Sequence, residues 1–168
     1  YSLFHNEENK EINCYYSGGS VAFSADQVEE DIIKMKSLGF NSFKMRVGLQ
    51  DWDKDLQRVS RANQVLKSDK LMVDAIMGTL SNKWSIKQAI SKIKDLEKYN
   101  IDWIEEPLGP SDLSDYKKLC EVSNVPIAMG EAYSGYLHFK EIASNNYADI
   151  IQVDATHSMG FRNLVDYS

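Results

Sequence analysis

Short apolar runs alternate along this chain with longer segments in which apolar residues recur every three or four positions. The short runs are rich in β-branched and aromatic residues and predict strands, whereas the longer spacing is typical of amphipathic helices. The six runs that predict strands are 12–19, 42–47, 71–75, 102–107, 125–131 and 149–154. The apolar positions that predict the helices between them are Val28, Ile32 and Met35, then Leu56, Val59, Ala62 and Leu66, then Ile86, Ala89, Ile90, Ile93 and Leu96, then Leu113, Tyr116, Leu119 and Cys120, and finally 137–143. A sixth helix is expected to begin near Gly160.

The first predicted helix carries capping signals at both of its ends. Ser24 is an N-cap candidate, and Gln27, three residues later, completes a capping box. Gly39 stands where a glycine commonly ends a helix. These signals fix the boundaries of the segment more closely than periodicity alone.

Strands that alternate with helices at this spacing predict parallel strands joined by right-handed crossovers. With 168 residues, of which 43% are hydrophobic, the chain can form one domain with a sizeable core. A (β/α)₈ barrel and an open doubly wound sheet both fit this pattern. Six strands by themselves favour the open sheet, but the placement of the acidic residues favours an incomplete barrel of about six βα units.

The net charge of −6 argues against a nucleic acid or an anionic membrane as a partner. No apolar run approaches the roughly 18 residues that a membrane span needs, and no signal peptide is visible. Cys14 and Cys120 are far apart and belong to no metal-binding or redox pattern, as expected of thiols in a cytoplasmic protein. We therefore expect a cytoplasmic protein.

Four acids lie at the C-terminal ends of predicted strands at regular intervals. Asp74, Glu105, Glu131 and Asp154 are separated by 31, 26 and 23 residues (105−74, 131−105 and 154−131), which is about one βα unit each. Parallel strands carry their C-terminal ends to one side, so we expect the acids to meet at one mouth. Clustered carboxylates repel unless a cation lies between them, and oxygen ligands without His or Cys favour Mg²⁺. The alternative is that each acid is the N-cap of the next helix.

The residues around these acids resemble a known family. VDA (73–75), WIEEP (103–107) and MGE (129–131) resemble, in order and spacing, the three metal-ligand strands of the enolase superfamily, in its mandelate racemase and acid-sugar dehydratase branch. SFKMRVG (42–48) resembles the second-strand Lys-x-Lys segment of that branch, and DIIQVD (149–154) resembles its sixth strand. The similarity runs from about residue 12 to 162.

The resemblance implies a ligand set and a reaction. Asp74, Glu105 and Glu131 would be the Mg²⁺ ligands, with Glu106 as a supporting neighbour, and Asp154 would orient a catalytic histidine. Lys44 and Arg46, two residues apart on one strand face, would complete the catalytic set. A base would remove the proton next to the carboxylate of a small-molecule substrate, and the metal would stabilise the enediolate. Return of the proton gives racemisation or epimerisation, and loss of a β-hydroxyl gives dehydration.

Three departures from the family pattern affect this interpretation. Arg46 replaces the usual second lysine, and arginine is a poor base, which favours a one-base dehydratase over a two-base racemase. The family's histidine lies on a seventh strand; His157, three residues after Asp154, is not that residue and is expected in a loop, while His5 and His138 are expected to be incidental. Ile76 and Met77 follow VDA where the family usually has Asn and often Gln, so the surroundings of the acids are less polar.

The family also has parts that this chain lacks. An N-terminal capping domain and two further barrel strands are absent, so we expect residues 1–168 to be a partial barrel domain from a longer enzyme. Its open sheet edges favour self-association, and a homo-oligomer is expected. A non-catalytic module or an inactive remnant stays open as the alternative. No GxGxxG or GxxxxGK[ST] motif supports a nucleotide enzyme. The substrate cannot be inferred from these residues.

Overall fold

A single parallel sheet forms the centre of the molecule. The structure is a computed structural model that describes residues 12–48 and 51–157. Its strands are β1 (Tyr16–Gly18), β2 (Ser42–Arg46), β3 (Lys70–Asp74), β4 (Ile101–Glu105), β5 (Ile127–Met129) and β6 (Ile150–Ile151), and they lie side by side in chain order. All five pairs of neighbouring strands are parallel. The helices between them are α1 (Ala25–Ser37), α2 (Trp52–Leu66), α3 (Ile86–Leu96), extended by the short 3₁₀ helix η1 (Glu97–Tyr99), α4 (Leu113–Val122) and α5 (Tyr136–Asn145).

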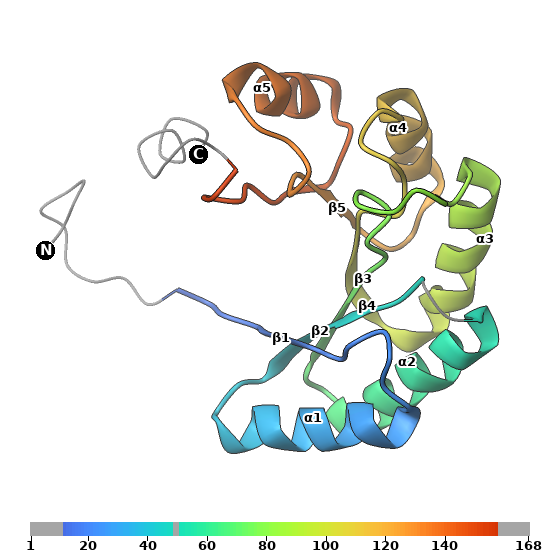
Figure 1. Ribbon diagram of the computed structural model, residues 1–168, viewed down its shortest axis with the longest axis vertical. Coiled ribbons are helices and arrows are strands. Elements are labelled where there is room, and N and C mark those ends of the chain that lie inside the picture. Colours follow the sequence, from blue (N-terminus) through green and yellow to red (C-terminus); the bar gives the residue numbers. More distant parts are fainter. Residues whose placement is uncertain (1–11, 49–50, 158–168) are drawn as a thin grey trace, which may run out of the picture.

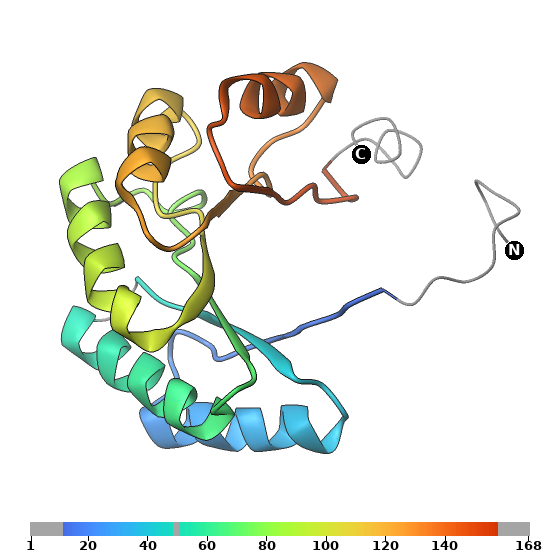
Figure 2. The same ribbon diagram turned by 180° about the vertical axis from the view of Figure 1, so that it is seen from behind.

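The helices distinguish between the two architectures that the sequence allows. They form an arc along one side of the sheet, and the opposite side is open (Figure 1). The reverse view shows the same arrangement (Figure 2). A doubly wound sheet carries helices on both faces and changes direction in its strand order, whereas a barrel keeps chain order and one helical side. The prediction of an incomplete (β/α) barrel is therefore confirmed.

Local signals in the sequence account for the helix boundaries. Ser24 caps α1, and its side chain and that of Gln27 exchange hydrogen bonds with each other's backbone, as the capping box predicts. Ser85 and Gln88 form the same arrangement at the start of α3. The helix α1 ends at Ser37 with Leu38 as its C-cap, and Gly39 follows with a φ of 87°, a value that favours glycine.

The core lies between the sheet and the arc of helices. Alternate residues of the strands point toward the helices, among them Phe43 and Met45 of β2 and Val73 of β3, all fully buried. The helical residues predicted to meet them include Val28, Ile32, Met35, Val59, Ala62 and Ile93, which are buried. Ile90 and, in the last predicted helix, Leu137 are exposed instead. The other face of the strands carries Lys44 of β2 and Asp74 of β3, with the buried Met72 between them.

The first and last strands are shorter than predicted. β1 has three residues and β6 has two, where the sequence predicts 12–19 and 149–154. Each pairs with one neighbour within the part of the chain that the structure describes, so fewer ladder hydrogen bonds hold its ends. The helix expected from Gly160 lies outside the described residues. No helix within 12–48 and 51–157 is long and apolar enough to cross a membrane.

Candidate active site

The register of the sheet brings three predicted residues into one row. Arg46 pairs with Asp74 across β2 and β3, and Asp74 pairs with Glu105 across β3 and β4. Each is the last residue of its strand. Lys44 precedes Arg46 by two positions and shares its strand face. The carboxyl end of the sheet, called the mouth below, therefore carries two acids and two cations on adjacent strands.

Asp74 and Glu105 are the buried acids of this row, at 5% and 2% exposure. Burial raises the pKa of Asp74 to about 6, although Lys44 and a hydrogen bond from the Ile76 N–H to Oδ1 (2.8 Å) oppose the rise. Burial also raises the pKa of Glu105 to about 7, and the charge of Asp74 adds to that rise. The Glu131 carboxylate raises both pKa values further, so its charge acts on the two buried acids.

Lys44 is the cation closest to these acids. Its Nζ lies 2.5 Å from Glu105 Oε2 and 5.3 Å from the centre of the Tyr15 ring. Burial lowers the pKa of Lys44, but the opposing charge and hydrogen bond of Glu105 outweigh it, and the pKa is raised overall. With its amide nitrogen turned toward Glu105, Gln152 donates to Oε1 (3.1 Å) and Oε2 (3.2 Å). Lys44 therefore keeps its proton here and places a positive charge beside Glu105.

Arg46 stands at the edge of the row. Its side chain is 54% exposed, and its Nε lies 3.8 Å from Asp74 Oδ2. An arginine that is half in solvent and loosely paired has hydrogen-bond donors left for a ligand, and its planar group suits a carboxylate. Its position fits the binding of a substrate carboxylate better than proton removal.

Glu131 reaches the mouth from a turn, two residues beyond β5. Its side chain is exposed, unlike those of Asp74 and Glu105. The turn begins at Gly130, with a φ of 143°, where an added Cβ would collide with the Gln152 carbonyl oxygen. The buried carboxylate of Glu106 accepts a hydrogen bond from the Ala132 N–H (3.0 Å), the residue after Glu131. Glu106 thus supports the turn that presents Glu131.

Asp154 lies three residues beyond β6, also in a turn. Its Oδ1 accepts hydrogen bonds from the Thr156 N–H (2.6 Å) and hydroxyl (2.7 Å), which lower the pKa of Asp154. The His157 Nδ1 is 3.0 Å from the Glu131 carbonyl oxygen and 3.9 Å from Asp154 Oδ2, and the pKa of His157 is raised by these two neighbours. His157 therefore lies in a loop, as predicted, and joins the turns after β5 and β6.

The acids at the ends of β3 and β4 and the acid after β5 are not helix caps. The N-cap residues of α3, α4 and α5 are Ser85, Asp112 and Gly135. The capping alternative is therefore wrong for Asp74, Glu105 and Glu131. Their positions at the mouth need another explanation.

A hard cation fits the chemistry of this donor set. Asp74 and Glu105 are buried carboxylates whose charges disfavour each other, with Glu131 adding to the effect, and a cation would remove that cost. Within the described ranges, no three His, Cys, Asp or Glu side chains are already arranged to hold an ion, and Glu105 is turned toward Lys44. Binding would therefore require the carboxylates to change partners. The assignment of Asp74, Glu105 and Glu131 as ligands stays a prediction.

Two contributors to the site were not foreseen from the sequence. Tyr15 packs edge-to-face against Trp103, with ring centres 5.5 Å apart, and lies under Lys44. Gln152 reaches Glu105 from beyond β6. The signal that could have found Gln152 is its place as a polar residue within the apolar run 149–154. Tyr15 sits in an ordinary strand pattern and gives no such signal.

A mouth lined by acids and cations on a one-sided parallel sheet defines the class of (β/α)-barrel domains. The chain belongs to the enolase C-terminal domain-like family, whose model matches residues 26–167. It is 30% identical over 146 residues to the L-talarate/galactarate dehydratase of Salmonella typhimurium LT2, covering 86% of this chain and 35% of that protein. It is 28% identical over 165 residues to the L-galactonate dehydratase of Hypocrea jecorina, covering 94% and 35%.

A solved structure agrees with these relatives. The crystal structure of a racemase from Streptomyces coelicolor A3(2) with bound magnesium is similar with a TM-score of 0.86 and 27% identity, over 93% of this chain and 46% of that one. Other relatives are named as a cycloisomerase and an epimerase. The chain spans about a third of the length of the two dehydratases, 35% of each. The relatives are enzymes of several reaction types that share one fold.

Proposed function

We propose that this chain forms the metal-binding part of an enzyme that removes the proton next to the carboxylate of an acid sugar or hydroxy acid and eliminates water. Asp74, Glu105 and Glu131 would hold Mg²⁺. The observation that carries the proposal is the row of Arg46, Asp74 and Glu105 on adjacent strand ends, with Lys44 at 2.5 Å from Glu105. The names of the two dehydratase relatives and the magnesium in the racemase structure support it.

The residues of this chain would divide the work between them. When bound, Mg²⁺ would supply positive charge that makes the proton next to the carboxylate more acidic. Arg46 would bind the substrate carboxylate with its exposed guanidinium. The Lys44 ammonium would stabilise negative charge as it develops at the mouth. Asp154 would orient and support the histidine that the family carries on a seventh strand; His157, whose Nδ1 lies 3.9 Å from Asp154, is not that residue.

Arg46 is the reason to prefer dehydration over racemisation. A racemase of this type needs a base on each side of the reacting carbon, and arginine does not give up its proton at ordinary pH. Lys44 is paired with Glu105 and also holds its proton. Proton exchange is therefore expected from one stereoisomer. An epimerase or racemase is the second candidate, supported by the relative named as an epimerase.

Magnesium titration by calorimetry tests the ligand set. Asp74→Asn, Glu105→Gln and Glu131→Gln should each weaken Mg²⁺ binding by about 100-fold or more, since each removes a charged ligand. Asp102→Asn is the matched control, because Asp102 is also on β4 but pairs outward with Lys70 at 3.0 Å. Unchanged affinity in all three ligand variants would refute the site.

The reaction is tested on the intact protein with galactarate, L-talarate, L-galactonate and arabinonate. Dehydration should produce a 2-keto acid, and NMR in D₂O should show exchange at the α-carbon of one stereoisomer. Exchange from both stereoisomers without loss of water would select the epimerase or racemase instead. Magnesium binding without exchange or turnover on any acid tested would argue against this chemistry.

A further inference from the structure

A buried ion pair in α2 serves no part of the chemistry described above. Arg58 and Asp55 are 2% and 0% exposed, and Arg58 Nη1 lies 2.6 Å from Asp55 Oδ1. Burying two charges costs free energy that their attraction often fails to recover, so such a pair is weak evidence for stability alone. The other hydrogen bonds of Arg58 and Asp55 therefore indicate what the pair does.

These hydrogen bonds go to the ends of the first two strands. Arg58 Nη1 donates to the carbonyl oxygen of Arg46 (3.1 Å), and Nη2 donates to those of Gly19 (3.0 Å) and Ser20 (2.6 Å). Asp55 Oδ2 accepts from the Gly48 N–H (2.8 Å). The pair thus joins the backbone just after β1 to the backbone at the end of β2. The Arg46 side chain extends toward the mouth from this second point.

The Arg46 backbone is held on both of its polar groups. Its N–H donates to the Gly19 carbonyl oxygen (3.2 Å), and its own carbonyl oxygen accepts from Arg58. Gly19 is itself fixed, because its N–H donates to Asp31 Oδ2 (2.8 Å). At a φ of 54°, an added Cβ on Gly19 would lie 2.5 Å from the Met45 Cβ. The half-exposed Arg46 side chain therefore extends from a backbone that buried groups hold in place.

We propose that Arg58, with Asp55, is a positioning residue for the Arg46 guanidinium. This inference rests on the proposed function, in which Arg46 binds the substrate carboxylate. The end of a long side chain has a defined position only if the backbone that carries it is fixed, and pre-organisation of that kind strengthens binding. The pair's own hydrogen bonds go to the backbone just beyond β1 and around the end of β2, and none of those described goes to the strands that carry Asp74 and Glu105. Its removal should weaken carboxylate binding and leave Mg²⁺ binding intact.

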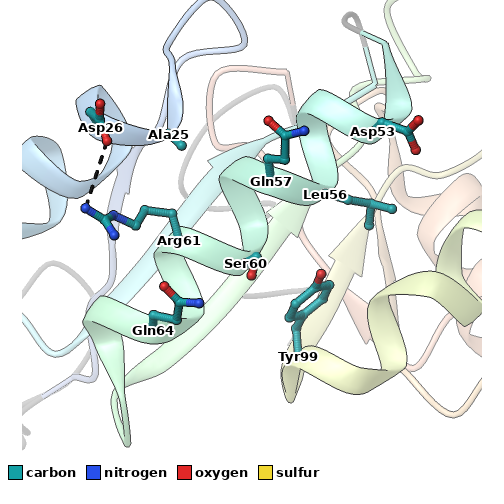
Figure 3. Close-up of a pocket in the computed structure, with 9 residues that line it drawn as sticks. All are labelled: Ala25, Asp26, Asp53, Leu56, Gln57, Ser60, Arg61, Gln64 and Tyr99. Atoms are coloured by element: carbon teal, nitrogen blue, oxygen red, sulfur yellow. Dashed lines mark ion pairs between the residues drawn. The ribbon is translucent and has the colours of Figure 1, made fainter.

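The test uses a paired variant that leaves no buried charge unpaired. Asp55→Asn with Arg58→Met removes both charges and the three bonds to carbonyl oxygens, while the asparagine introduced by Asp55→Asn keeps an acceptor for the Gly48 N–H. Arg58→Lys is the conservative variant, which keeps the ion pair but not the planar group with its several donors. The matched control is Arg61→Met on the same helix. Arg61 is 42% exposed and pairs with two acids of α1, Glu29 and Asp26 (Nη2 to Asp26 Oδ1, 3.9 Å), and it lines the pocket between α1 and α2 that Figure 3 shows.

Three readouts separate positioning from folding and from the proposed function. Hydrogen exchange over 42–48 should be about tenfold faster in the paired variant and unchanged in Arg61→Met. Mg²⁺ affinity should stay within about twofold of the parent, while affinity of the Mg²⁺-loaded protein for L-tartrate falls about tenfold, and less in Arg58→Lys. In an Arg46→Met background, the paired variant should cause no further loss of tartrate affinity.

Two results would overturn the inference: unchanged exchange over 42–48, or a tartrate loss that adds fully to that of Arg46→Met. If the parent binds neither Mg²⁺ nor L-tartrate, the proposed function fails instead, and the inference about Arg46 as a carboxylate-binding group fails with it. The exchange measurement still shows in that case whether Arg58 fixes the Arg46 backbone. If the paired variant does not fold, Arg58→Lys carries the same comparison.

Discussion

The two halves of the mouth are built in different ways. In the half formed by β2, β3 and β4, three five-residue strands end in register, and their last residues are Arg46, Asp74 and Glu105. In the half formed by β5 and β6, the strands have three and two residues. Glu131 and Asp154 come from turns beyond them. The acids of the first half are buried, whereas Glu131 is exposed and Asp154 is only half-buried.

This difference separates two ways of placing a charged group. The sheet fixes the first half, and burial there changes the pKa values of Asp74 and Glu105. The second half depends on a few hydrogen bonds, such as the one that Glu106 accepts from the Ala132 N–H and the two that Thr156 donates to Asp154. A charged side chain at a buried strand end has little conformational freedom, and its burial costs electrostatic free energy. A charged side chain on an exposed turn has more freedom and a smaller cost. We expect substitutions in the first half to change stability and those in the second half to change it little.

The largest expected effect is on how the free energy of unfolding of the metal-free protein depends on pH. Comparing Asp74→Asn with the parent measures the contribution of Asp74 to it. A carboxyl group whose pKa is raised by folding favours the folded state below its unfolded pKa and loses that advantage as pH rises through the folded pKa. For Asp74 this window runs from 3.8 to about 6. That difference in pKa corresponds to about 3 kcal/mol, so Asp74→Asn should be more stable than the parent by up to that amount at pH 8.

At pH 4 the same variant and the parent should have nearly equal free energies of unfolding, measured by urea titration in the presence of EDTA. Glu131→Gln is the control from the other half of the mouth. Because Glu131 is exposed, its variant should differ from the parent by less than about 0.5 kcal/mol at both pH values. A difference between Asp74→Asn and the parent that does not change with pH would contradict the burial explanation.

Lys44 and Arg46 give the next comparison, within the first half alone. Lys44→Met leaves Glu105 without its cation, and the free energy of unfolding should fall by about 2 kcal/mol at pH 8. At pH 5.5 the loss should be much smaller, because Glu105, with a pKa of about 7, is then protonated in both proteins. Arg46→Met should cost less than about 0.5 kcal/mol, as expected of an exposed ion pair.

Urea unfolding of the metal-free proteins at the two pH values measures both changes. The Lys44 ion pair is buried with a separation of 2.5 Å, and the Arg46 ion pair is half-exposed with a separation of 3.8 Å. Equal losses of stability for Lys44→Met and Arg46→Met would show that this difference in burial and distance does not affect the free energy of unfolding. A Lys44→Met loss that persists at pH 5.5 would instead point to packing of the lysine chain against the Tyr15 ring.

The sequence predicts the first half of the mouth better than the second. The runs predicted at 71–75 and 102–107 overrun β3 and β4 by one and two residues, but their acids, Asp74 and Glu105, lie within the sheet as its last strand residues. The same reasoning extends β5 to Glu131 and β6 to Asp154, and both strands end earlier. Gly130, with its φ of 143°, ends the extended backbone after β5. Apolar alternation shows that a segment can be extended, but not that it is paired.

Contacts between distant parts of the chain are the features that the sequence conceals. A charged pair three residues apart on a helix, such as Asp55 and Arg58, is typical of an exposed surface. Its burial depends on the carbonyl oxygens of Gly19 and Arg46, which are 39 and 12 residues away. Nothing near Arg58 in the sequence indicates those partners. The hydrogen bond from the Ala132 N–H to the Glu106 carboxylate joins residues 26 positions apart, and the sequence hides it in the same way.

The smallest expected effect concerns Ile76, where the sequence departs from the family pattern. Its φ is 51°, a left-handed conformation that is costly for a β-branched residue and well tolerated by Asn. The Ile76 N–H donates to Asp74 Oδ1 (2.8 Å), so the strain lies beside a proposed ligand. Ile76→Asn should relieve about 1 kcal/mol and raise the melting temperature by about 2–4 °C. Ile76→Val keeps the branched Cβ and should give no such gain. Differential scanning calorimetry of the three proteins decides the matter, since equal melting temperatures for the Asn and Val variants would mean that backbone strain at this strand end is not what distinguishes them.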